Sequence, residues 1–85
     1  MKTTEPVDPT DVVVQALAVE LKTSEERVRA ARSLKADLKM DSIAAVNVAF
    51  LIEEEYEIEI EIDERDSFDS VEAIVAIVRR AFTTR

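Results

Sequence analysis

The sequence predicts an all-α fold built by one small domain. Three segments repeat apolar residues at the three- and four-residue spacing of an amphipathic helix. The core residues are mainly Ala, Val, Ile and Leu, and only three Phe and one Tyr are present. A chain of 85 residues buries about 60–65% of its unfolded surface, which suffices for one modest core. Residues 1–8 are polar and are expected to be a flexible N-terminal segment, followed by a single domain over 9–85.

The first helix is predicted over about 9–22. Asp8 suits the N-cap and Pro9 the first helical position, and Val13 and Leu17 begin a helical apolar pattern. The region 23–40 is harder to interpret. Its Glu, Arg, Ala, Lys and Leu residues favour a helix through much of 25–38 by propensity alone.

A second long helix is predicted over about 42–56. Its expected apolar face consists of Ile43, Val46, Ala49, Phe50 and Leu51 or Ile52. Residues 56–62 then alternate between polar and apolar like a half-buried strand. Because no second alternating run exists to pair with it, this segment is interpreted as an extended connector that buries Ile58 and Ile60.

A short helical turn is predicted over about 62–67 and the last helix over about 70–82. Asp69-Ser70-Val71-Glu72 resembles a capping box, with Asp69 as the cap and Glu72 reaching back to it. The apolar spacing then continues through Ile74 and Ile77.

Charge and composition exclude several classes of function. The formal net charge of −8 argues against nucleic acid and against an anionic membrane, and it favours a basic patch on a partner protein. The chain contains neither Cys nor His, so thiol nucleophiles, thiolate metal sites and the commonest general base are missing. No apolar run approaches the roughly 20 residues that span a bilayer. The first five residues lack the apolar core of a signal peptide, so a cytoplasmic location is expected.

Ser42 is the clearest candidate for a residue with a chemical role. It follows Asp41 at the predicted start of a helix, where free N–H groups and the helix dipole favour an anion. A Ser–Lys pair with Lys39 or Lys35 is conceivable, but nothing else in the sequence supports it. A calcium loop beginning at Asp63 lacks the necessary mid-loop glycine. Ser42 is therefore interpreted as an acceptor of modification, although the Asp41-Ser42 pair by itself is more typical of an ordinary helix cap.

The context of Ser42 resembles a known family. Asp37-Leu38-x-x-Asp41-Ser42-Ile43 is similar to the attachment motif of acyl carrier proteins, which usually reads Asp-Leu-Gly-x-Asp-Ser-Leu. Glu53-Glu54-Glu55-Tyr56 with Ile58 and Ile60 resembles the end of that family's second helix, and Glu25-Glu26-x-Val28 lies at the family's spacing. The resemblance spans about residues 10–82.

This resemblance implies a four-helix bundle, with three longer helices, one short helix over about 62–67 and a long loop between the first two long helices. It replaces the helix favoured over much of 23–40 by a turn of helix around 25–31, followed by a loop pinned by Leu34 and Leu38.

The resemblance also implies a function. A separate phosphopantetheinyl transferase would attach 4′-phosphopantetheine from coenzyme A to Ser42, and the thiol of that group would carry acyl groups as thioesters. The protein would then be a monomeric carrier, not an enzyme, serving acyl-transferring or acyl-modifying enzymes of fatty-acid, lipid or polyketide-type synthesis through their basic docking patches. Its implied recognition residues are Asp41, Ile43, Lys39, Asn47, Glu53 and Glu54. The residues implied to line an acyl-chain pocket, or simply to form the core, are Leu34, Val46, Phe50, Ile60, Phe68, Ile74 and Ile77.

The chain departs from the family pattern near the attachment motif. Lys39 replaces the motif glycine, and Ala44, Ala45 and Asn47 stand where the family is often acidic. We interpret this as the mark of a specialised carrier for a dedicated acyl pathway. Two other hypotheses remain: an unmodified acidic helical interaction module, and an enzyme that uses Ser42 or paired carboxylates.

Overall fold

Helices make up most of the structure, a computed structural model that describes residues 8–60 and 68–83. Its helices are Thr10–Leu21 (α1), Glu25–Ala30 (α2), Leu34–Leu38 (α3), Ser42–Tyr56 (α4) and Val71–Thr83 (α5). The described residues contain no strand, and the predicted all-α class and acyl-carrier-like helical bundle are confirmed. The short helix predicted over 62–67 lies outside the described residues.

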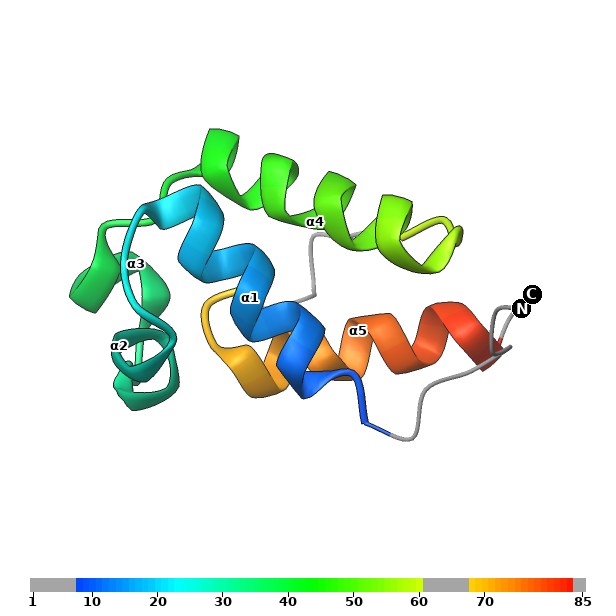
Figure 1. Cartoon of the computed structure of the whole chain (residues 1–85), viewed down its shortest axis with the longest axis horizontal. Coiled ribbons are helices and arrows are strands. Elements are labelled where there is room, and N and C mark those ends of the chain that lie inside the picture. The colour runs from blue at the N-terminus through cyan, green and yellow to red at the C-terminus, as the bar shows by residue number, and fades with distance from the viewer. Residues whose placement is uncertain (1–7, 61–67, 84–85) are drawn as a thin grey trace.

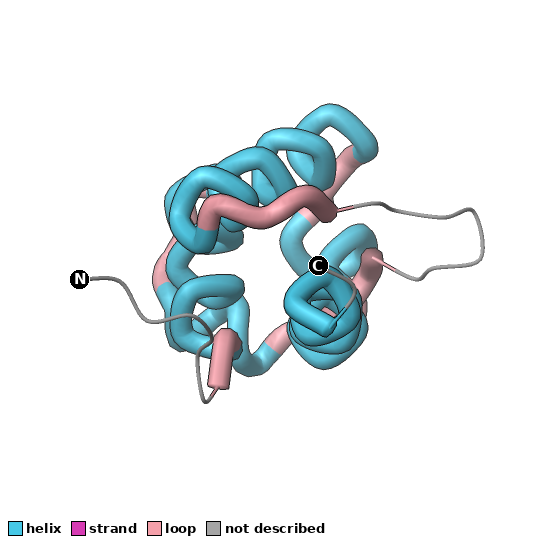
Figure 2. The backbone as a smooth tube through the Cα atoms, turned by 90° about the vertical axis from the view of Figure 1, so that its right-hand side faces the viewer, coloured by secondary structure: helices cyan, strands magenta, loops and turns pink. Residues whose placement is uncertain are grey.

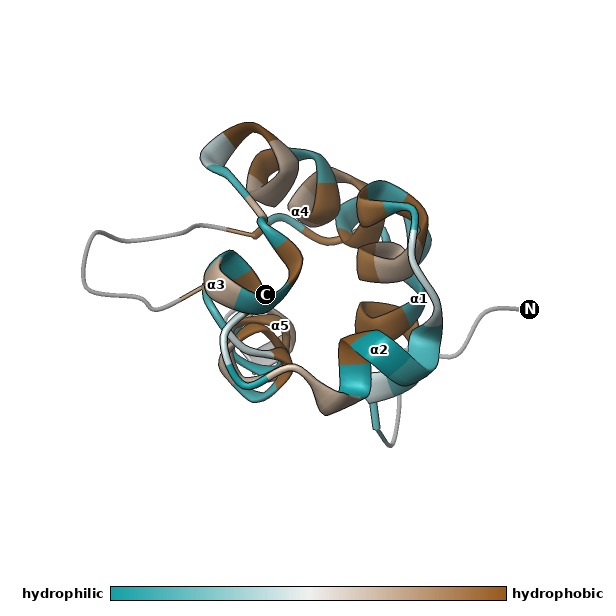
Figure 3. Cartoon of the chain, turned by 90° about the vertical axis from the view of Figure 1, so that its left-hand side faces the viewer, coloured by the Kyte–Doolittle hydropathy of each residue, from teal (hydrophilic) through white to brown (hydrophobic). Residues whose placement is uncertain are grey.

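Helix α1 is the central element of the bundle. It packs against α2, α4 and α5 (Figure 1). Seen from the side in Figure 2, the helices surround a common interior. Helices α2 and α3 lie together at one end of the molecule, beside the start of α4, and α2 is largely hydrophilic (Figure 3). The start of α4 therefore stands at the end of the bundle that is built by the two short helices.

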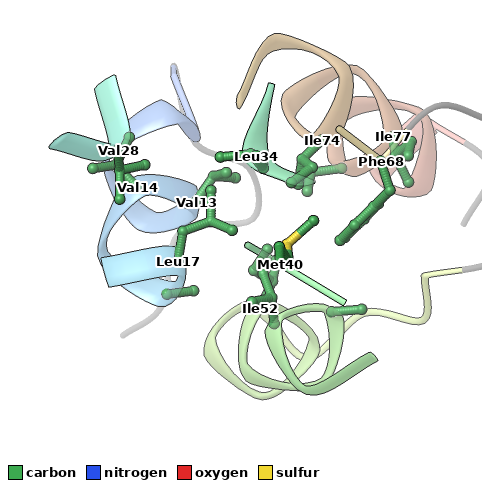
Figure 4. Close-up of a cluster of buried hydrophobic side chains, with 14 of the residues drawn as sticks. Val13, Val14, Leu17, Val28, Leu34, Met40, Ile52, Phe68, Ile74 and Ile77 are labelled. Atoms are coloured by element: carbon green, nitrogen blue, oxygen red, sulfur yellow. The ribbon is translucent and has the colours of Figure 1, made fainter. Parts of the chain in front are cut away.

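The core is formed by aliphatic side chains from every helix. Val13, Leu17, Val28, Leu34 and Ile52 are fully buried. Figure 4 shows Leu34, Met40 and Ile74 directed into the interior between α1, α4 and α5. Burying one such side chain contributes about 1.5–3 kcal/mol, so this cluster holds the helices together.

Helix α1 begins one residue later than predicted. Pro9 occupies the N-cap position and Asp8 supplies the side-chain acceptor. Asp8 Oδ1 accepts the N–H of Thr10 at 3.1 Å and its hydroxyl at 2.6 Å. These bonds hold the pKa of Asp8 below its usual value, first through the hydroxyl and then through the N–H.

The region before α4 contains two short helices. The predicted turn of helix around 25–31 is confirmed as α2, which begins where Ser24 Oγ accepts the N–H of Arg27 at 3.1 Å. The predicted loop after it is wrong, because Leu34–Leu38 is helical. Ser33 Oγ caps this helix by accepting the N–H of Ala36 at 3.1 Å, and the fully buried Leu34 anchors it to the core.

Helix α4 has the predicted bounds and buries Ala49 and Ile52 as predicted, but other residues of its expected apolar face are exposed. Val48, Ala49 and Ile52 are buried, whereas Val46 and Phe50 are 64% and 57% exposed. The helix is apolar on nearly every side along its first eleven residues, so the spacing could not decide which face meets α1. Val46 and Phe50 consequently do not lie between the helices, which corrects their predicted place in an acyl-chain pocket.

The start of α5 also corrects a prediction. Ser70, not Asp69, caps this helix, because Ser70 Oγ accepts the N–H of Ala73 at 3.1 Å. The carboxylate of Asp69 instead accepts hydrogen bonds from Ser33 and from the backbone of Lys35.

Three helices end on a residue with left-handed backbone geometry. These residues are Lys22, Lys39 and Glu57, with φ values of 56°, 59° and 58°. Glycine is the residue that adopts this geometry most readily, and this chain contains none. After Glu57, the chain buries Ile58 and half-buries Ile60, as predicted for the connector. None of the described helices has the length and hydropathy that a membrane crossing requires.

Candidate functional site

Ser42 is the first residue of α4, and its side chain is exposed. The cap of this helix is Asp41, whose Oδ1 accepts the N–H of Ala44 at 2.8 Å. Within the part of the chain that the structure describes, the Ser42 hydroxyl has no hydrogen-bond partner. Asp41 thus performs the capping that the sequence left open for either residue, and the hydroxyl of Ser42 is free to react.

The turn before Ser42 is fixed from inside the protein. The N–H groups of Lys39 and Met40 both donate to the carbonyl oxygen of Leu34, the latter at 3.1 Å. The Met40 side chain is only 3% exposed and points into the core (Figure 4). The sequence interpretation missed Met40, whose only signal is a single apolar residue between Lys39 and Asp41.

Asp37, the first residue of the motif, has a structural role. Its Oδ2 accepts the N–H groups of Arg32 at 2.9 Å and Ser33 at 3.3 Å. Leu38 beside it packs partly buried against the core. The two acids of the motif therefore stabilise the backbone at the starts of two successive helices, Asp37 just before α3 and Asp41 at the start of α4.

An apolar surface lies directly beyond Ser42. Ile43, Val46 and Phe50 are 71%, 64% and 57% exposed, and their spacing places them on one side of α4. We call these three residues the α4 stripe. Large exposed apolar side chains grouped in this way mark interaction surfaces.

The charged and polar recognition candidates divide into two groups. Lys39, Asp41 and Glu54 are exposed. By contrast, Asn47 donates from Nδ2 to Glu20 Oε2 at 2.9 Å, which joins α4 to α1. The partly buried Glu53 accepts the N–H of Ile60 at 2.8 Å through Oε2. Asn47 and Glu53 therefore have partners within the protein.

The remaining pocket candidates lie in or against the core. Leu34 and Ile74 are fully buried, and Ile77 and Phe68 are 5% and 9% exposed. They belong to one cluster, against which the half-buried Ile60 packs. The structure thus brings these five residues together, on the opposite side of α4 from the α4 stripe.

Comparison with known proteins identifies the family. A family model described as "Phosphopantetheine attachment site" matches residues 11–78. The chain belongs to this phosphopantetheine-binding family. Searches of curated proteins and of solved structures each gave no match. The family assignment agrees with the resemblance to acyl carrier proteins.

Members of the phosphopantetheine-binding family carry 4′-phosphopantetheine covalently and are not themselves catalytic. The residues present here fit that group. Ser42 offers an exposed, unbonded hydroxyl, and within the described chain the N–H groups of Ser42 and Ile43 also have no partner. Unpaired N–H groups and the helix dipole both favour a phosphodiester at this helix end.

Proposed function

We propose that this protein is an acyl carrier whose Ser42 holds the 4′-phosphopantetheine group. The observation that carries the proposal is the free, exposed hydroxyl of Ser42 at the start of α4, inside the family's matched range. The group would come from coenzyme A through a separate transferase: the Ser42 oxygen bonds to the phosphorus that bears the pantetheine arm, the pyrophosphate bond of coenzyme A breaks, adenosine 3′,5′-bisphosphate leaves, and the serine proton passes to the transferase. When bound, it supplies a thiol that carries an acyl group as a thioester.

The protein's own residues prepare Ser42 for this role. Asp41 caps α4 and so leaves the serine hydroxyl without a competing bond. Met40 anchors the turn in the core, which restricts the position of the serine. Neither residue activates the hydroxyl, and with no His or Cys in the chain the transferase provides the base.

We further propose that partner enzymes dock along α4. The α4 stripe offers apolar contact next to Ser42, and Glu54 supplies a negative charge toward the far end of the helix. Partners with a basic patch and an apolar depression fit this surface. Lys39 lies three residues before Ser42, and the first turn of α4 contains no acid, so the acidic residues within α4 begin only at Glu53. This arrangement supports a specialised carrier with its own acyl-transferring enzymes.

The experiment is a transfer assay with an intact-mass readout. The protein is incubated with coenzyme A, magnesium and a promiscuous phosphopantetheinyl transferase. We expect a gain of one phosphopantetheinyl group, and no gain for Ser42→Ala. If several transferases fail to modify the folded wild-type protein, the chain is instead an unmodified interaction module that uses the α4 stripe.

The docking proposal has a separate test. Binding of the transferase to the apo protein is measured as ionic strength rises. The affinity is expected to fall with added salt, because exposed charges are screened over a Debye length of about 8 Å at 0.15 M. An affinity independent of salt would rule out a contribution from Glu54.

A further inference from the structure

Asp69 lies just before α5, yet its hydrogen bonds connect to a helix 34 to 36 residues earlier in the chain. Its Oδ2 accepts the hydroxyl of Ser33 and its Oδ1 accepts the N–H of Lys35, both at 2.7 Å. Its carbonyl oxygen accepts the N–H of Leu34, also at 2.7 Å. One residue therefore receives three bonds from the first turn of α3.

Helix α3 depends on these bonds because it is too short to persist alone. It has five residues, and isolated helices shorter than about 12–15 residues are marginal in water. The first N–H groups of any helix lack partners within it. Asp69 satisfies those of Leu34 and Lys35, and Ser33, which Asp69 also holds, satisfies that of Ala36.

The other end of α3 leads directly to the attachment site. Its Leu34 carbonyl receives the N–H groups of Lys39 and Met40. Met40 is the buried anchor immediately before the Asp41 cap and Ser42. If α3 loosens, the bonds that fix the turn before Ser42 are lost with it.

We propose that Asp69 is a positioning residue for the modification of Ser42, because it keeps α3 folded and α3 fixes the turn that presents the serine. The inference rests on the proposed attachment at Ser42. It goes beyond that proposal by giving the start of α5 a part in a reaction that takes place at the start of α4.

The electrostatics of Asp69 support this role. The Lys35 N–H, and next the Ser33 hydroxyl, hold the pKa of Asp69 below its usual value. Asp69 therefore remains a carboxylate at neutral pH, with both oxygens available as acceptors. Ser70 caps α5, so Asp69 serves α3 instead of its own helix.

Ser70 provides a matched control. Ser70→Ala removes a helix cap at the neighbouring position and destabilises α5, but it leaves every bond to α3 in place. Asp69→Ala removes the carboxylate bonds to α3 and leaves the α5 cap intact. A general loss of stability affects both variants, whereas a loss of positioning affects only Asp69→Ala.

The test combines transferase kinetics with amide hydrogen exchange at a temperature where all variants are folded. For Asp69→Ala we expect KM for the apo protein to rise about two- to tenfold with little change in kcat, because apparent affinity falls with the fraction of molecules in the competent state. The amides of Lys39 and Met40 should exchange faster by a larger factor, because exchange rises in proportion to the open fraction, whereas KM rises only when the competent fraction falls appreciably. Ser70→Ala should change neither quantity.

Two further variants keep the test decisive if Asp69→Ala is poorly folded. Asp69→Asn retains an oxygen that can accept the Lys35 N–H and should show an intermediate rise in KM. Ser33→Ala should raise KM as well, and its effect should not add to that of Asp69→Asn because the two residues share one network.

The inference is overturned if Lys39 and Met40 exchange at the wild-type rate in Asp69→Ala or Asp69→Asn. It is also overturned if KM changes equally in the Asp69 and Ser70 variants. If either result is found while the wild-type protein is modified normally, the proposed role of Asp69 is wrong but the proposed function of Ser42 remains. If no transferase modifies the wild-type protein, both the role of Asp69 and the function of Ser42 are wrong.

Discussion

Replacing the left-handed residues at the helix ends by glycine should stabilise this protein. Lys39 is the most informative position, because it lies three residues before Ser42 and has φ 59° and ψ 37°. Lys22 and Glu57 have nearly the same geometry at the ends of α1 and α4. All three side chains are exposed, so their removal leaves no cavity.

The size of the effect follows from two opposing contributions. A residue with a Cβ atom in the left-handed region costs about 1–2 kcal/mol. Glycine avoids this cost. It also raises the entropy of the unfolded chain, which lowers the resulting stabilisation by about 0.4–1 kcal/mol. The net stabilisation is about 0.5–1 kcal/mol for each site, which for a domain of this size raises Tm by about 2–8 °C.

Urea and thermal unfolding of Lys39→Gly and Lys39→Ala measure this contribution directly. Both variants remove the charge, but alanine keeps the Cβ atom, so the difference between them isolates the backbone strain. Ala36→Gly in the middle of α3 is the opposite control and should lose about 0.5–1 kcal/mol. A Lys39→Gly variant no more stable than Lys39→Ala would refute the argument.

Three further predictions concern the attachment site and its surroundings. Asp41→Ala should cost about 0.5–2 kcal/mol in urea unfolding because it removes the α4 cap, whereas Ser42→Ala should cost less than about 0.5 kcal/mol; the reverse order would show that the cap is misassigned. Because the pKa of Asp69 is lowered in the folded state, its contribution to stability is complete above the usual carboxyl pKa of about 3.9 and is lost as the pH falls below it. The stability difference between wild type and Asp69→Asn should therefore shrink between pH 6 and about pH 3, and a constant difference would contradict this. Phe50→Ser should weaken transferase binding but change stability by less than about 0.5 kcal/mol, whereas Ile52→Ala should cost about 2–5 kcal/mol; a large loss of stability in Phe50→Ser would place that ring in the core.

The long helices were predicted well because the residues that begin a helix lie next to it in the sequence. Pro9 and the Asp41-Ser42 pair begin helices within one residue of the predicted positions, since caps act through the first turn. The extended connector was predicted for a similar reason, because the alternation around Ile58 leaves only one face to bury.

The parts that the sequence could not predict depend on contacts between distant segments. Helix α3 is stabilised by Asp69, 34 to 36 residues later in the chain than the groups it binds. Propensity favoured a helix over 34–38 but not the break that precedes it, and the family resemblance replaced that helix by a loop. The buried face of α4 is selected by α1, and a segment that is apolar on nearly all sides carries no periodic signal for that choice. For the same reason, the exposure of Phe50 emerged only from the packing.

The geometry around Ser42 was predicted better than that of the other candidate residues. Ser42 and Asp41 were singled out because the motif is contiguous, and the structure places them at the start and the cap of α4. Asn47 and Glu53 were predicted to be recognition residues, and both have partners within the protein. The sequence could not show these bonds, because polarity alone does not distinguish a docking residue from one that bonds the backbone or a neighbouring helix. Met40 was overlooked because a single apolar residue in a polar turn is a weak signal.

The central claim is that Ser42 is the attachment residue. Fragment mass spectrometry of the protein purified from its own cells tests it most directly, because it identifies the modified side chain. We expect one phosphopantetheinyl group, carried by the peptide that contains Ser42 and bonded to that hydroxyl. A group located on any of the other four serines, or a fully unmodified chain under conditions where other carriers in the same cells are modified, would contradict it.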